Sequence, residues 1–248
     1  MHGAAGWAMA LGLLLTSIAT PVAPADIEAP PAFSARYDVR KAGLTLGHAE
    51  LRFRRPAPTR YLYRLSIRPN RLAGLFTSSR VREMSIGRIR ADGFRPDVYR
   101  YTRSGGDDER RAELRFDWDA MRVVNDIANR PWRMAITPDT IDRVISPLQL
   151  MHDLAHRDAN DDTLVYRIAD GGRLKTYELT VGETTPVETP AGRFEARTIR
   201  RSAADSDRVT TLWVAPALRY LAIQVEQREA GDRNFRMVLS EIDGLARP

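Results

Sequence analysis

Alternation of apolar and polar residues recurs along this chain, and it constrains the fold more than any other feature. Residues 33–40 begin the pattern, with Phe33 and Tyr37 on the apolar phase and polar residues on the other. The same two-residue period returns in 49–54 and 61–67. Successive side chains of a β-strand point to opposite faces, so each segment predicts a strand with one apolar and one solvated face. Three such strands in a row favour an antiparallel sheet.

Strand signals continue through most of the chain. Glycine, proline and aspartate clusters separate the apolar runs at spacings of roughly 8–12 residues, which is typical of a sandwich or barrel. No linker, repeat or low-complexity tract interrupts them, so residues 33–245 are predicted to form a single β-rich domain. The expected fold class is mainly β: an antiparallel, strongly curved sheet or barrel-like domain with one helix packed on or inside it. The further strands are expected at 78–89, 96–103, 112–118, 121–127, 132–136, 164–169, 174–181, 186–189, 194–200, 210–214, 220–228 and 235–242.

One helix is predicted, over residues 146–157. Ser146 is a good N-cap, Pro147 suits the first helical position, and Gln149 stands where a capping box places Glu or Gln. The helix carries a wide apolar arc, which predicts a plug packed against the sheet. The members of this arc are Leu148, Leu150, Met151, Leu154 and Ala155.

The N-terminal segment has the pattern of an export signal. An apolar run spans residues 7–19, and Ala23-Pro24-Ala25 forms an A-x-A cleavage site. We therefore expect a signal peptide at residues 1–25, a Pro-rich leader at 26–32 and a periplasmic mature protein. The apolar run is too short for a comfortable membrane span, and no later run approaches that length. The sequence has no cysteine, so disulfides and thiol chemistry are excluded.

No motif specifies a catalytic chemistry. The sequence contains no G-x-G-x-x-G, P-loop, G-x-S-x-G or H-E-x-x-H pattern. Because a Ser-His-acid triad is defined by geometry, a hydrolase of unknown type stays open as an alternative. His152 and His156 have the spacing of two metal-binding imidazoles on one helix face, but a zinc site needs a third ligand, which the sequence does not nominate. We therefore predict no metal and no cofactor, and we place both histidines on the polar side of the helix.

Arginine dominates the charge of the protein. The formal net charge is +6 and the pI about 9.9, and every basic residue except Lys41 and Lys175 is arginine. Outward arginines are either ordinary sheet surface or a site for the phosphates of lipid or lipopolysaccharide head groups. We expect no nucleic-acid partner for an exported protein and at most a peripheral membrane contact. The candidates for binding an anionic surface are Arg52, Arg54, Arg64 and Arg68.

A curved sheet of this length can enclose a ligand cavity. Barrels of about eight strands sometimes hold one small ligand. Large aromatic side chains are more often part of a core, yet they would also line such a cavity. The residues expected to line it are Tyr61, Tyr63, Tyr99, Phe116, Trp118, Leu148, Met151 and Trp213.

Three segments together resemble a known family. They are Tyr37-Asp38-Val39 with Gly43 and Leu46-Gly47-His48-Ala49, the helix start Ile145-Ser146-Pro147-Leu148, and the C-terminal stretch from Val187 to Ala196 with Leu212-Trp213-Val214. The chain resembles the exported proteobacterial proteins of domain-of-unknown-function family 3108. This resemblance implies a single β-rich periplasmic domain and supplies no catalytic residues. A looser likeness to lipoprotein-carrier folds, in which a curved sheet covers a helix over an apolar cavity, is a fold analogy.

Three functions remain open at this point. The first is a non-enzymatic periplasmic protein that binds an apolar or amphipathic component of the cell envelope, such as a lipid or lipopolysaccharide. The second is a structural or protein-interaction module of the envelope that uses the basic outer face. The third is the hydrolase. Whether the protein is an enzyme at all is undecided, with the balance against it.

Overall fold

A computed structural model gives the structure of the protein. It describes residues 29–70, 79–105, 109–125, 131–156, 162–203, 206–228 and 234–245. The signal peptide expected at 1–25 and residues 26–28 of the leader lie outside the described residues. Residues 29 and 30 of the leader are buried, and Ala29 packs on the core.

All the strands of the described chain belong to one sheet. Its order is β8-β7-β6-β5-β4-β3-β2-β1-β15-β14-β13-β12-β11-β10-β9. The first half contains β1 (Phe33–Lys41), β2 (Leu44–Ala57), β3 (Arg60–Pro69), β4 (Arg80–Arg90), β5 (Gly93–Ser104), β6 (Arg110–Asp117), β7 (Arg122–Asn125) and β8 (Trp132–Ala135). The second half contains β9 (Thr140–Asp142), β10 (Thr163–Asp170), β11 (Arg173–Thr189), β12 (Gly192–Ala203), β13 (Ser206–Ala215), β14 (Leu221–Arg228) and β15 (Phe235–Asp243).

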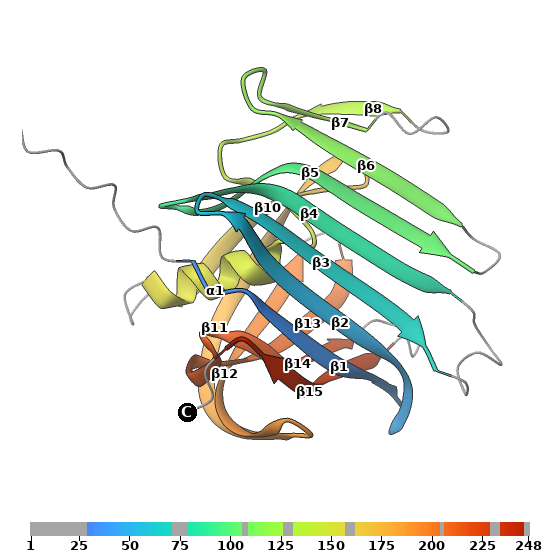
Figure 1. Cartoon of the computed structure of the whole chain (residues 1–248), viewed down its shortest axis with the longest axis vertical. Coiled ribbons are helices and arrows are strands. Elements are labelled where there is room, and N and C mark those ends of the chain that lie inside the picture. Colours follow the sequence, from blue (N-terminus) through green and yellow to red (C-terminus); the bar gives the residue numbers. More distant parts are fainter. Residues whose placement is uncertain are drawn as a thin grey trace, which may run out of the picture.

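The sheet is antiparallel and strongly curved, as the alternation predicts. The two halves join where β15 pairs with β1, and Figure 1 shows them curving toward each other. Register shifts interrupt several ladders, for example between Ile86 and Gly87 of β4, and such bulges bend a strand and increase its twist. In the described part of the chain, the two ends of the sheet, β8 and β9, are not paired with each other. The sheet is therefore barrel-like, with a seam.

Two predicted segments differ in detail from the structure. The strands expected at 174–181 and 186–189 are one long strand, β11, which continues through a bulge between Val181 and Thr184. The approach to the helix contains the short strand β9, which pairs in parallel with β10. A single turn of 3-10 helix, η2 (Pro216–Leu218), follows β13.

The helix α1 (Ser146–His156) lies at one end of the curved sheet, where Figure 1 shows it between the two halves. Leu148, Leu150, Met151 and Leu154 of the predicted apolar arc are buried, whereas Ala155 is exposed. No helix in the described residues is long and apolar enough to cross a membrane.

The helix start is capped differently from the prediction. The Ser146 hydroxyl donates to the carbonyl of Arg143, so it does not cap the helix N–H groups. Asp142 accepts the Ile145 N–H instead, at 2.9 Å. Gln149 does not close a capping box, because its amide oxygen accepts the N–H of Phe94 in β5 at 2.8 Å. The amide therefore ties α1 to the sheet.

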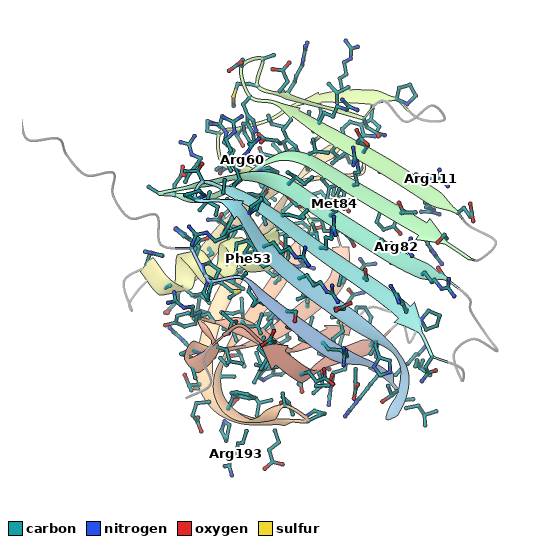
Figure 2. All side chains as sticks on the ribbon, viewed as in Figure 1. Phe53, Arg60, Arg82, Met84, Arg111 and Arg193 are labelled. Carbon is teal, nitrogen blue, oxygen red and sulfur yellow. The ribbon has the colours of Figure 1, made fainter. Side chains whose placement is uncertain are left out.

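Aromatic rings fill the core beneath the helix. Phe53, labelled in Figure 2, lies in β2 with its ring centroid 6.1 Å from that of Phe94. Phe94 in turn contacts Tyr61 edge-on at 5.4 Å and His152 of α1 at 6.4 Å. Edge-to-face packing of this kind fixes the rings relative to one another, so the helix is held against a preformed apolar surface.

Candidate functional site

A buried series of hydrogen-bonded side chains connects the sheet to the start of the helix. The Asp142 carboxylate is fully buried and accepts the hydroxyl of Ser85 at 2.5 Å. The Ser85 hydroxyl also lies 2.9 Å from that of Tyr61. Burial raises the pKa of Asp142 to about 7. The carboxyl group is thus poised to hold a proton that an exposed aspartate would release.

A second polar cluster occupies the concave side of the sheet. Arg143, which directly follows β9, forms an ion pair with Glu83 of β4 at 2.7 Å and donates to the Tyr99 hydroxyl at 3.3 Å. The Arg143 guanidinium also lies 5.2 Å from the ring centre of Tyr101. Glu83 is only 8% exposed, whereas the Arg143 side chain keeps 43% of its surface exposed. One side of this guanidinium is therefore fixed and the other is open.

Arg201 of β12 adds another cation to the concave side. It shares a face with the buried Leu179, its cross-strand partner, and its guanidinium lies 5.0 Å from the ring centre of Tyr177. Its guanidinium donates to the Thr210 hydroxyl at 3.3 Å. Burial lowers the pKa of Arg201, and the charge of Arg143 adds to this effect. Among the residues that the structure describes, no carboxylate forms an ion pair with Arg201.

A cleft of about 390 Å³ opens where the first half of the sheet meets the turn between β10 and β11. We call it the seam cleft. The ring of Trp132 in β8 lies against Gly172 of that turn, so the two halves touch at the cleft. Its walls combine aromatic rings with cations and one acid. They include Tyr99, Tyr101, Arg110, Leu114, Trp132, Arg143 and Asp170.

Apolar side chains on the concave side remain partly exposed away from the helix. Leu51 and Leu65 are cross-strand partners in one row, which continues through Glu83 to Tyr101. Both leucines and Tyr101 are only partly buried, and so is Ile67 in the next row. The Glu83–Arg143 ion pair therefore stands at the edge of an apolar surface.

The predicted cavity-lining residues occupy different places in the structure. Tyr61, Tyr63 and Leu148 are fully buried in the core. Phe116 and Trp118 stack on each other, and the Trp118 indole donates to the Pro96 carbonyl at 2.8 Å.

The other three predicted lining residues are closer to solvent or to a pocket. Tyr99 lines the seam cleft. Met151 lines a separate pocket beside His152 and His156. Trp213 stands between the buried Leu212 and Val214, so it points to the outer face of the sheet.

The two helix histidines lie together, but not as predicted. Their rings stack with centroids 4.3 Å apart. His156 is exposed, as expected, whereas His152 is buried against Phe94; its placement on the polar side is therefore wrong. The helix sinks deeper between the sheet halves than its apolar arc alone requires. In the described part of the chain, no three His, Cys, Asp or Glu residues are grouped to hold a metal ion.

The four predicted surface arginines lie on the outer face of the sheet, all exposed. Arg52 stands directly opposite Arg64 across β2 and β3. Arg52 pairs with Glu50 at 2.6 Å. Within the described residues, Arg54, Arg64 and Arg68 form no ion pair.

Sequence reasoning missed the concave arginines. Arg201 shares its strand face with the buried Ile199, but Arg193, Glu195 and Arg197 on the same phase of β12 are not buried, so local alternation does not mark it. Glu83, in contrast, shares a phase with buried Ser85 in β4. A charged residue on the apolar phase of a strand is the signal that could have identified Glu83, because a buried charge needs a partner.

One family model matches most of the chain, and one solved structure agrees with the fold. A family model described as "Protein of unknown function (DUF3108)" matches residues 35–239. A solved β-barrel-like protein of the domain of unknown function DUF1849 from Brucella abortus is similar, with a TM-score of 0.56 and 14% identity over 87% of this chain and 98% of that one. A candidate exported protein with a YmcC-like fold from Bacteroides fragilis gives a TM-score of 0.30 and 13% identity, covering 87% and 97% of the two chains. No curated protein matches.

Proposed function

The chain belongs to the DUF3108 family of proteins of unknown function, and we propose that it is an exported, non-enzymatic protein that binds an anionic amphipathic component of the cell envelope. The molecule would bind on the concave side of the sheet. Its anionic group would contact the two concave arginines, and its apolar part would cover the exposed apolar row.

One observation carries the proposal: Arg201 is a partly buried cation beside the buried apolar residues Leu179 and Ile199, and among the described residues no carboxylate forms an ion pair with it. Removing a charge from water is costly unless an opposite charge compensates it. A bound phosphate or carboxylate would provide that charge and accept hydrogen bonds from the guanidinium fork. The open side of Arg143 offers a second contact for the same anion.

The apolar surroundings favour an amphiphile over a small inorganic anion. Leu51, Leu65, Ile67 and Tyr101 are partly exposed on the concave side, which costs free energy in water. Covering them with an acyl chain would recover about 0.8 kcal/mol for each buried methylene group. The export pattern in residues 1–25 would bring the protein to the compartment where such molecules occur.

The test compares two ligands that share a chain length, dodecyl phosphate and the uncharged dodecyl maltoside, by isothermal titration calorimetry. We expect the mature protein to bind dodecyl phosphate more tightly. Arg201→Gln should weaken that binding by about 10- to 100-fold, the range for a hydrogen bond to a charged group, and leave the maltoside unaffected. Arg201→Lys keeps the charge and should retain part of the affinity.

Arg200→Gln is the matched control. Arg200 is the neighbouring residue on the same strand, but it is exposed on the opposite face. Circular dichroism checks that each variant folds. Equal losses in Arg200→Gln and Arg201→Gln, or no preference of the original protein for the phosphate, would refute the proposal. No specific observation favours the hydrolase alternative.

A further inference from the structure

The outer face of the first half of the sheet carries an excess of arginine. Side chains of β2, β3 and β4 alternate between the two faces of the sheet. On the outer face, Ser66 of β3 lies directly across from Arg82 of β4. Figure 2 shows Arg82 and Met84 on this face of β4. We call the following four residues the outer basic face: Arg54, Arg64, Arg68 and Arg82.

These four arginines are exposed, and none forms an ion pair within the described residues. On the same side of the sheet, Glu50, Asp97 and Glu113 pair with five other arginines of β2 to β6. Arg80 and Arg111 are exposed as well and form no ion pair within the described residues. The outer basic face is thus part of a surface on which arginines outnumber the acids that pair with them.

The arrangement has an electrostatic cost in the free protein. Arg64 and Arg68 flank Ser66, the cross-strand partner of Arg82, so both lie diagonally across from Arg82 within reach of long side chains, and like charges there repel each other. Adjacent strands are about 4.8 Å apart, so guanidinium groups on successive strands can contact one phosphate together. A layer of phosphates would relieve the repulsion.

An apolar row runs beside these charges. Leu62, Ile86 and Val98 are cross-strand neighbours on the outer face, and Arg54 stands at one end of their row. All three apolar side chains are only partly buried. Met84 lies between Arg64 and Arg100 in the next row. The surface is therefore amphipathic: it offers both cations and apolar contacts to a partner.

We propose that the outer basic face docks the protein on an anionic lipid surface, with the arginines on head-group phosphates and the apolar row at the interface. This goes beyond the concave binding site and does not depend on it. A sheet face is broad and lacks the groove that a peptide requires. Strand addition is also excluded here, because β2, β3 and β4 are paired along both edges. A bilayer surface fits this shape and charge.

The outer face and the seam cleft adjoin. Arg111 of β6, labelled in Figure 2, is exposed, lies across from Thr102 on β5 and also lines the seam cleft. Docking through the outer basic face would therefore hold this cleft close to the lipid head groups.

The test is co-sedimentation of the mature protein with vesicles of phosphatidylglycerol and phosphatidylcholine, against vesicles of phosphatidylcholine alone. We expect binding to the anionic vesicles only, and its loss at high salt. Each arginine near an anionic surface contributes about a five-fold change in partitioning. One combined variant replaces all four arginines of the outer basic face: R54Q, R64Q, R68Q and R82Q. Its binding to the anionic vesicles should therefore be weaker than that of the original protein by a factor above about 100.

A second combined variant removes the same charge elsewhere, at four exposed arginines distributed over β8, β11 and β12. We expect it to keep most of the vesicle binding. Equal loss in the two variants would show an effect of net charge alone and overturn the proposal. Failure of the original protein to bind anionic vesicles would also overturn the proposal. This holds even if the same face is then found to bind an acidic protein. The control variant contains R133Q, R173Q, R193Q and R200Q.

Discussion

The buried Asp142 predicts a specific dependence of stability on pH. Its pKa rises from 3.8 to about 7 on folding because burial disfavours the charged form. The folded protein therefore holds a proton that the unfolded chain releases between these two values. The stability from this proton is fully present below pH 3.8 and is lost as the pH rises through 7. At 1.36 kcal/mol for each pH unit, the total loss is about 4 kcal/mol.

The variant Asp142→Asn isolates this effect. An amide has no proton to lose, its oxygen can still accept the Ile145 N–H, and its NH₂ group can donate to Ser85. The free energy of unfolding should be measured by urea denaturation with tryptophan fluorescence from pH 5 to 8. Over this interval we expect the original protein to lose about 3 kcal/mol relative to the variant.

The control is Asp119→Asn, in the exposed turn after β6. It removes one carboxylate at the surface, and it therefore tests whether the loss of one negative charge is enough to produce the effect. A constant difference for Asp142→Asn across the pH range, or a difference that changes in the opposite direction, would refute the reasoning.

Three further predictions use the same urea assay. Leu148→Ala should lower the free energy of unfolding by about 2–5 kcal/mol because it leaves a cavity under the helix, whereas Leu44→Ala, at a residue 61% exposed, should change it by less than about 0.5. Gln149→Leu should cost about 1–3 kcal/mol, since it leaves the buried N–H of Phe94 without an acceptor. Gly93→Ala should cost a similar amount, because residue 93 has a φ of +111° and a methyl group there would overlap the Gln149 amide. Its cost and that of Gln149→Leu should not add, and strict additivity would contradict this contact.

The sequence was sufficient to predict the sheet and its two faces. The two-residue alternation assigns Phe33 and Tyr37 to the core and Arg52 and Arg64 to the outer face, and the structure places them there. Hairpin turns then pair consecutive strands, which accounts for most of the strand order.

Contacts between distant segments could not be predicted from local pattern. The bond from Gln149 to Phe94 joins residues 55 positions apart, and it replaces the local capping box that the spacing suggested. His152 looked polar on the helical wheel, but a wheel does not show how deeply the sheet surrounds a helix. The ion pair on the concave side could not be predicted for the same reason, because Arg143 and Glu83 are 60 positions apart and meet only in the folded chain.

The pairing of β1 with β15 has a consequence for the time course of folding. Ser34 lies opposite Asp243, so the two halves of the sheet are joined by the first and last strands of the chain. Every other antiparallel pair of strands joins neighbours in sequence. Closing a loop of this length has a large entropic cost before any contact compensates it, so such pairings slow folding. Until β15 is available, β1 and β14 each present an open edge that can pair with another chain. The protein is thus most prone to aggregate just before its last strand docks.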